Sequence, residues 1–267
     1  MKNKQLIKIS IIILVACAVF GFVVPGTSGV KVEKNNFCKL VEGYDGTKIR
    51  ESPVYFIARS NTSFIVDANW EKPQWKQVKP VEILNHMGER PLFSPYTEAK
   101  MMYDEEHLYI IFRVHDKYVR SVIRQFNGPV YEDSAVEFFF SPDNKCPGEY
   151  FDLEINCGGT PLICYVPNKK EFTGDDIKKI SIAHSMPNVV DPEIKKEVIW
   201  TIECKIPFQL LEKFTAMSRP NRGDCWRANF FKTASKGSNP HYMTWAVIKS
   251  SKPNFHLPEF FGKLKFL

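Results

Sequence analysis

The chain has 267 residues, of which 44% are hydrophobic, 25% charged and 13% aromatic. A chain of this composition can bury a core, which excludes a disordered tail and a collagen-like repeat. The formal net charge is +6, and Lys2, Lys4 and Lys8 supply three of these charges before any acidic residue occurs. The remaining +3 is distributed over the rest of the chain without a dense basic patch, so we expect no nucleic-acid partner.

The first 29 residues have the three parts of a secretory signal peptide. The N-terminal lysines lead into an apolar stretch at 9–24, which ends at the small residues of Pro25–Gly29. About 16 apolar residues are fewer than the ~20 of a spanning helix. Leu14–Cys17 also resembles a bacterial lipobox, in which Cys17 would carry lipid. We expect a secreted or periplasmic protein, with a membrane anchor through this segment as the alternative. A lead-in segment, 30–53, follows.

Export changes the interpretation of the cysteines, because disulfides form in oxidising compartments. Six cysteines follow the signal peptide, and an even number allows up to three disulfides in fifteen pairings, among which the sequence does not choose. A zinc site is not indicated, since no CxxC pair occurs. The six are Cys38, Cys146, Cys157, Cys164, Cys204 and Cys225.

Residues 54–267 have the pattern of a single β-domain. Short apolar or alternating runs that end at turn residues predict strands at 108–114, 135–140, 150–156, 198–206, 226–231 and 262–266. One short helix is expected at 208–214. This pattern indicates an all-β fold, an antiparallel β-sandwich of jelly-roll or immunoglobulin-like type with one or two short helices.

Alternation along each strand separates an apolar face from a mixed face. Glu137, Asp152, Glu154 and Arg113 all lie on mixed faces, beside aromatic residues. If these strands share one sheet, the mixed faces form a polar surface with aromatic rings, which suits a ligand rich in hydroxyl groups. The alternative is that they are the ordinary solvent-facing side of a half-buried sheet.

A series of segments through this domain follows the order of a known family. They are Ile65–Asp67 with Trp75, Tyr103–Ile110, Tyr131–Phe140, Tyr150–Asn156, Trp200–Pro207, Trp226–Phe230, Trp245 and Phe255–Gly262. On these residues the chain resembles the family 9 carbohydrate-binding modules of the DOMON-like β-sandwich group, over about residues 54–267. The similarity is strongest to exported, stand-alone members.

The resemblance implies non-catalytic binding of a terminal sugar or short oligosaccharide between two aromatic rings, with polar groups bonding the hydroxyls. It places the first ring at Tyr131, the second at Trp245 and an acidic ligand contact at Glu137. A basic ligand contact of the family aligns near Glu154, a carboxylate here, which leaves the sugar specificity open. Arg113, on the mixed face of a strand expected to be a neighbour, is our candidate for the missing donor.

Two further residues complete the expected site. Asn156 would bond a sugar hydroxyl, and His256 in the closing motif is either a structural residue or a ligand contact. The resemblance also implies that structural calcium occurs in such proteins, and Asp67 and Asp143 lie in loops rich in carboxylates, although no spacing demands a metal. A haem alternative rests on Met101, Met102, Met243 and His241.

Two other functional classes stay open. Paired carboxylates are the machinery of glycoside hydrolysis, so Glu137 and Glu154 would be the catalytic pair of an enzyme. No GxSxG, HExxH or P-loop motif indicates another chemistry. The third class is an extracellular adhesion or scaffold sandwich. We expect a monomer whose partner is a carbohydrate.

Overall fold

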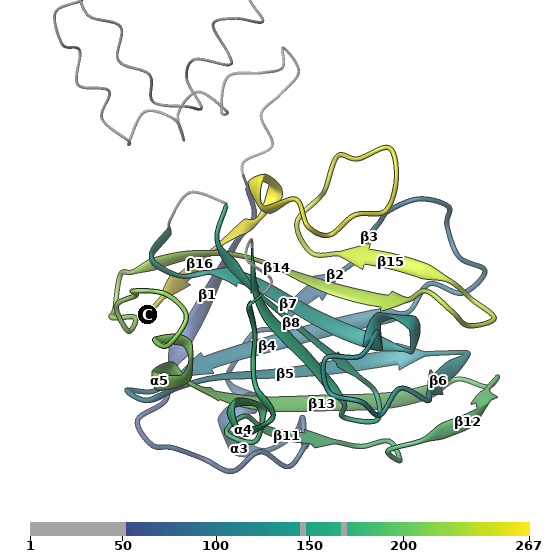
Figure 1. The fold of residues 1–267 in the computed structure, drawn as a ribbon, viewed down its shortest axis with the longest axis horizontal. Coiled ribbons are helices and arrows are strands. Elements are labelled where there is room, and N and C mark those ends of the chain that lie inside the picture. The colour runs from purple at the N-terminus through teal and green to yellow at the C-terminus, as the bar shows by residue number, and fades with distance from the viewer. Residues whose placement is uncertain (1–51, 145–147, 167–169) are drawn as a thin grey trace, which may run out of the picture. The chain divides into compact units, whose positions relative to one another are not determined.

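The computed structural model describes residues 52–144, 148–166 and 170–267, and β-strands dominate them (Figure 1). Sheet A contains, in spatial order, β10 (Lys170–Glu171), β9 (Pro161–Val166), β8 (Tyr150–Asn156), β7 (Ala135–Ser141), β14 (Cys225–Ala234), β16 (Gly262–Phe266) and β1 (Val54–Arg59), with β15 (His241–Thr244) beside β14 and β3 (Asn85–His86) beside β15.

Sheet B continues from β1 through β4 (Tyr96–Tyr103), β5 (His107–Asp116), β13 (Val198–Pro207) and β11 (Ser181–His184), with β2 (Val81–Ile83) beside β4. A two-stranded ribbon joins β6 (Val119–Ser121) to β12 (Val190–Ile194). The helices are single turns: α3 (Pro73–Lys76), α4 (Gly174–Ile177), α5 (Phe208–Leu211), η3 (Val130–Glu132), η4 (Pro142–Asn144) and η5 (Pro258–Phe260).

Strand β1 belongs to both sheets. Its first residues, Val54–Ile57, pair in parallel with β16, and Ala58 and Arg59 pair in parallel with β4. The other strand pairs are antiparallel. The expected all-β sandwich is therefore confirmed, with parallel pairing confined to this shared strand.

The core lies between the two sheets and is built from the apolar faces that the alternation predicts. On β8 it takes Phe151, Leu153 and Ile155, and on β5 it takes the even-numbered residues from Leu108 to Val114. Trp200 and Trp226 are fully buried here, as expected of core residues. Period-two alternation works on these strands because one face of each is closed by the opposite sheet.

The outer face of sheet B is covered as well. Phe64 and Trp75 pack on Tyr109 of β5, and Phe64 stacks on the Tyr109 ring with centroids 4.1 Å apart. Glu203 of β13 holds this covering segment in place: it accepts hydrogen bonds from Lys72 Nζ at 2.9 Å and from Trp75 Nε1 at 2.8 Å. Trp75 is thus buried, but outside the central core.

The four cysteines that the structure describes are Cys157, Cys164, Cys204 and Cys225, and they carry free thiols. No disulfide joins any of these four to another, because they lie on different strands and faces: Cys204 and Cys157 in the core, Cys164 on the outer side of β9. Cys38 and Cys146 lie outside the described residues, as do Cys17 and the expected signal peptide. Within the described ranges, no helix is long and apolar enough to cross a membrane.

Candidate functional site

Three carboxyl groups lie side by side on the outer face of sheet A. Glu137 of β7 and Glu154 of β8 are directly opposite each other in register, and Asp152 follows on the same face of β8, opposite Phe139. Each of the three is buried, with 2%, 4% and 3% of its surface exposed for Glu137, Glu154 and Asp152. We call Glu137, Asp152 and Glu154 the acidic cluster.

Burial raises the pKa of all three carboxyl groups. The pKa of Glu137 and that of Glu154 lie well above the ordinary range, first through burial and then through the charge of the neighbouring acids. Burial raises the pKa of Asp152 to about 7. The opposing effects are smaller: Lys232 lowers the pKa of Glu137 from the other side of the sheet, and the backbone N–H of Tyr131 lowers that of Glu154.

Two oxygens of the acidic cluster have no hydrogen-bond partner among the described residues. They are Oδ1 of Asp152 and Oε2 of Glu154. The other oxygen of Asp152 is 3.7 Å from the Cys164 thiol, a weak donor. A buried acceptor without a partner costs about 1–3 kcal/mol, so a ligand that donates to these oxygens would recover that free energy.

Aromatic side chains border the cluster on the β14 side. Phe231 lies across from Glu137 in register. The ring of Phe255 stacks on the ring of Phe231, with centroids 4.2 Å apart. His256 stacks on Phe139 at 5.2 Å, and its Nδ1 lies 2.9 Å from the Tyr150 hydroxyl. The chain after β15 therefore covers part of this face, as the yellow loop between β15 and η5 shows in Figure 1.

Tyr131 lies at the other border, in the single turn η3. Its carbonyl accepts from the Ser235 amide at 3.0 Å, which holds the backbone, while 43% of the residue is exposed. Leu162 of β9, half-buried, is directly opposite Glu154 in register. The structure thus brings Tyr131, Glu137 and His256 of the expected site to one face.

Trp245 lies on the opposite side of sheet A from Glu137. It follows β15, and its ring packs edge-on against Phe230, whose side chain belongs to the core, at 5.4 Å. The absence of a side chain at Gly262 leaves room for the indole of Trp245, because a Cβ at this glycine would come within 2.4 Å of the ring. The resemblance implies that Tyr131 and Trp245 face each other across one sugar. In the structure they instead lie on opposite sides of sheet A.

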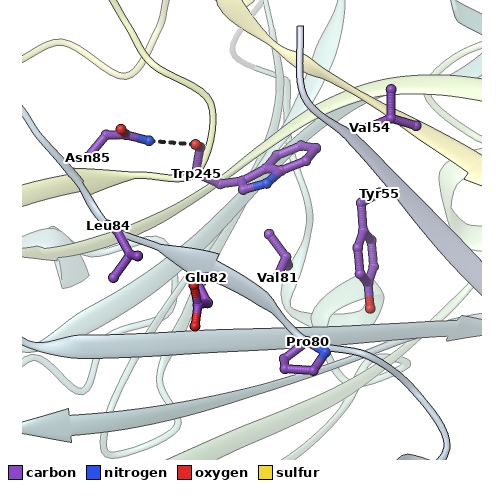
Figure 2. A pocket seen from close by; sticks show the side chains of 8 residues that line it. All are labelled: Val54, Tyr55, Pro80, Val81, Glu82, Leu84, Asn85 and Trp245. Carbon is purple, nitrogen blue, oxygen red and sulfur yellow. Dashed lines mark hydrogen bonds between the residues drawn. The ribbon is translucent and has the colours of Figure 1, made fainter.

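The Trp245 ring instead borders an open hollow with a volume of about 470 Å³. Figure 2 shows the indole above Val81 and beside Tyr55, with the Asn85 amide donating to the Trp245 carbonyl at 2.6 Å. The lining residues are Val54, Tyr55, Pro80, Val81, Glu82, Leu84, Asn85 and Trp245. This hollow, which we call the Trp245 hollow, is a separate aromatic surface.

Arg113 is not a neighbour of the acidic cluster. Its strand, β5, pairs with β4 and β13 in sheet B, so the expectation of a strand adjacent to β7 was wrong. Arg113 donates to Glu98 at 2.6 Å and lies 4.4 Å from the centre of the Trp70 ring. Alternation predicts the face of a residue within its strand, but not the sheet to which the strand belongs.

Asn156 has the expected strand but a structural set of contacts. Its Nδ2 donates to the Ile123 carbonyl at 2.9 Å and to Asp133 at 3.0 Å, and its Oδ1 accepts from the Thr160 amide. Both ends of the side-chain amide are therefore engaged in holding the loops around η3. Sequence reasoning missed Phe255 and Tyr150 as neighbours of the site: both begin segments that carry the family resemblance, but nothing in those segments indicates a contact with Phe231 or with His256.

The structure shows the surroundings of the residues named for calcium and for haem. Asp67 is ion-paired with Lys72 at 2.6 Å, which lowers its pKa. The side chain of Asp143 lies outside what the structure describes. Among the described residues, no three His, Cys, Asp or Glu side chains are grouped as a metal site would require. Of the haem candidates, Met101 and Met243 lie in the central core, whereas Met102 packs on the outer face of sheet B.

Comparisons with known proteins agree with this fold. A protein described as "Extracellular protein" from Arthroderma benhamiae (strain ATCC MYA-4681 / CBS 112371) is 23% identical over 181 residues, which cover 65% of this chain and 79% of that protein. A proposed carbohydrate-binding protein from Bacteroides uniformis ATCC 8492 is similar in structure, with a TM-score of 0.73, 22% identity, and coverage of 81% of this chain and all of the other.

A family 9 carbohydrate-binding module from Caldicellulosiruptor kristjanssonii, solved with cellotriose, has a TM-score of 0.56, 15% identity, and coverage of 80% of this chain and 93% of the module. The same organism's module has also been solved with glucose. The sequence profile of carbohydrate-binding family 9 matches residues 68–266, from the segment that covers sheet B to the last strand. Since that match includes most of the chain and the fold agrees with it, the chain belongs to carbohydrate-binding family 9.

Proposed function

We propose that this protein is an exported carbohydrate-binding protein and that its sugar lies on the acidic cluster, beside Tyr131. The observation that carries the proposal is the pair of buried carboxyl oxygens, on Asp152 and Glu154, that lack a donor among the described residues. Sugar hydroxyls are the donors that such oxygens need, and an exposed ring at Tyr131 offers a face for stacking. Family membership and the sugar complexes of the Caldicellulosiruptor kristjanssonii modules support this choice of ligand.

The electrostatics of the cluster support binding without cleavage. A glycoside hydrolase needs two carboxyl groups whose pKa values differ, so that one is an acid while the other is ionised. Here burial raises the pKa of Glu137 and of Glu154 in the same direction. Carboxyl groups whose pKa values are raised together are held toward their neutral forms, which hydrogen-bond sugar hydroxyls and are poor nucleophiles and bases.

Calorimetric titration of the purified protein with cellotriose, glucose and a panel of plant and host oligosaccharides tests the proposal. We expect saturable binding that weakens at least several-fold in Tyr131→Ala, because an aromatic stacking contact contributes about 0.5–1.5 kcal/mol beyond area burial. Phe56→Ala is the matched control, since it removes an exposed ring from β1, away from the cluster. Reducing sugar released in the same samples would indicate the enzyme alternative.

A parallel titration of Trp245→Ala distinguishes the two aromatic surfaces. Loss of binding in this variant with retention in Tyr131→Ala would move the sugar to the Trp245 hollow. If no glycan binds the wild-type protein, the adhesion or scaffold alternative replaces sugar binding. We also propose that the protein is exported, which the extracellular relative from Arthroderma benhamiae supports, and that it is a monomer. The N-terminal mass of the protein recovered from the medium tests export, and its size-exclusion volume tests the monomeric state.

A further inference from the structure

The acidic cluster contains three carboxyl groups and no cation. None of the ion pairs that the described residues form includes Glu137, Asp152 or Glu154. Lys232 is near Glu137, but it lies on the other side of the sheet, where its Nζ is 3.2 Å from Asp116, 2.8 Å from His241 and 2.9 Å from the Thr233 carbonyl. Its charge is therefore already used in the core.

The cluster lacks both a positive charge and hydrogen-bond donors for its two unpartnered oxygens, and a charged donor would supply both. A hydroxyl group would satisfy one unpartnered oxygen, on Asp152 or on Glu154. An ammonium group has three N–H donors, so it can donate to more than one acceptor, and its charge favours the ionised form of a carboxyl group beside it. Hydrogen bonds between ionised partners are about twice as strong as those between neutral ones.

We propose that the ligand of this site is a basic sugar, one whose ring carries a free ammonium group, as in glucosamine and its oligomers. The inference rests on the proposed function, since it names the sugar for the same face. The ammonium would lie between Asp152 Oδ1 and Glu154 Oε2, with the sugar ring against Tyr131. Leu162 of β9, half-buried, lies opposite Glu154, and the inference requires its side chain to move so that the ligand reaches the carboxyl group.

Ligand binding at this place should release protons. Burial favours the protonated forms of Asp152 and Glu154, and an ammonium neighbour would favour their ionised forms. The titratable groups that face the cluster are Tyr150 on β8, Cys164 on β9 and His256 in the segment after β15. Lys232 acts on Glu137 from the other side of the sheet. A neutral sugar would leave their protonation unchanged.

The test compares three disaccharides that differ at C2: β-1,4-linked glucosamine dimer, its N-acetylated form, and cellobiose. Each is titrated calorimetrically at about pH 6 in two buffers of different ionisation enthalpy, which measures the protons released. We expect the glucosamine dimer to bind about tenfold more tightly than cellobiose, with proton release only for the amino sugar. Glu154→Gln and, separately, Asp152→Asn should remove most of this preference, whereas Glu197→Gln, an exposed carboxylate beyond β12, should retain it.

The outcomes separate this inference from the proposed function. Equal affinity for the amino and neutral disaccharides, or a preference that both cluster variants retain, would overturn the basic-sugar inference and leave sugar binding intact. Failure of all three sugars, together with the oligosaccharide panel above, would overturn the proposed function itself. The two variants alter different residues of β8, and a denaturation curve for each identifies one that has not folded.

Discussion

The acidic cluster should make the protein less stable as the pH rises from about 4 to about 7. Asp152 titrates with a pKa of 3.8 when exposed, and burial raises that pKa to about 7 in the folded protein. Below the lower value both states are protonated, so the group is neutral to stability. Between the two values the unfolded chain ionises first, so the free energy of unfolding falls; above the upper value the loss is complete.

The magnitude follows from the pKa difference. Each unit is worth about 1.36 kcal/mol, so a rise from 3.8 to about 7 corresponds to a loss on the order of 4 kcal/mol for Asp152. The group is almost fully buried, so solvent screens it little. Glu137 and Glu154 act in the same direction, and the charge of Asp152 contributes to both of their shifts.

Asp152→Asn is the matching perturbation, with Glu197→Gln as the exposed control. Urea denaturation at about pH 4 and at about pH 7 gives the free energy of unfolding of each protein. Burying an asparagine amide has its own cost, but that cost does not depend on pH and cancels in the difference between the two pH values. We expect Asp152→Asn to lose about 2–4 kcal/mol less than the wild-type protein over this interval. An unchanged pH dependence would refute the assignment of Asp152 as a buried, neutral acid.

Three further predictions concern stability and binding. Gly262→Ala should lower the free energy of unfolding by about 1–3 kcal/mol, because its Cβ would collide with the Trp245 ring. A shift in tryptophan fluorescence together with a lower urea midpoint would show this, and an unchanged midpoint would contradict the contact. Glu203→Gln should cost about 1–3 kcal/mol, since it removes the buried carboxylate from Lys72 and leaves that lysine the exposed Asp67 as its acidic partner. Limited proteolysis should then cut between residues 63 and 78; resistance equal to that of the wild type would argue against this anchor. Tyr131→Ala should weaken sugar binding with little effect on unfolding, as an exposed side chain allows, and a large loss of stability would contradict its role as a ligand surface.

The sequence by itself determined the strands and their inward faces. Tyr150–Asn156 and Gly262–Phe266 begin and end as expected, and Phe151, Leu153 and Ile155 lie in the core as the alternation predicts. These features depend on neighbouring residues in the chain, because side chains along a strand alternate with a period of two. The same local pattern placed Glu137 and Glu154 on the face opposite the core.

Only the tertiary structure decided which of these faces meet. Arg113 and Glu137 have equivalent patterns, yet their strands lie in different sheets, and strand order depends on pairings between distant residues. Trp245 leaves the end of β15 toward the core side, while Phe255 and His256 return beside the acidic cluster, on Phe231 and Phe139, along an irregular segment that has no period to follow. The position of the site therefore depends on how the sheets close around β1 and on the path of a loop, and neither property is encoded in the spacing of residues along one strand.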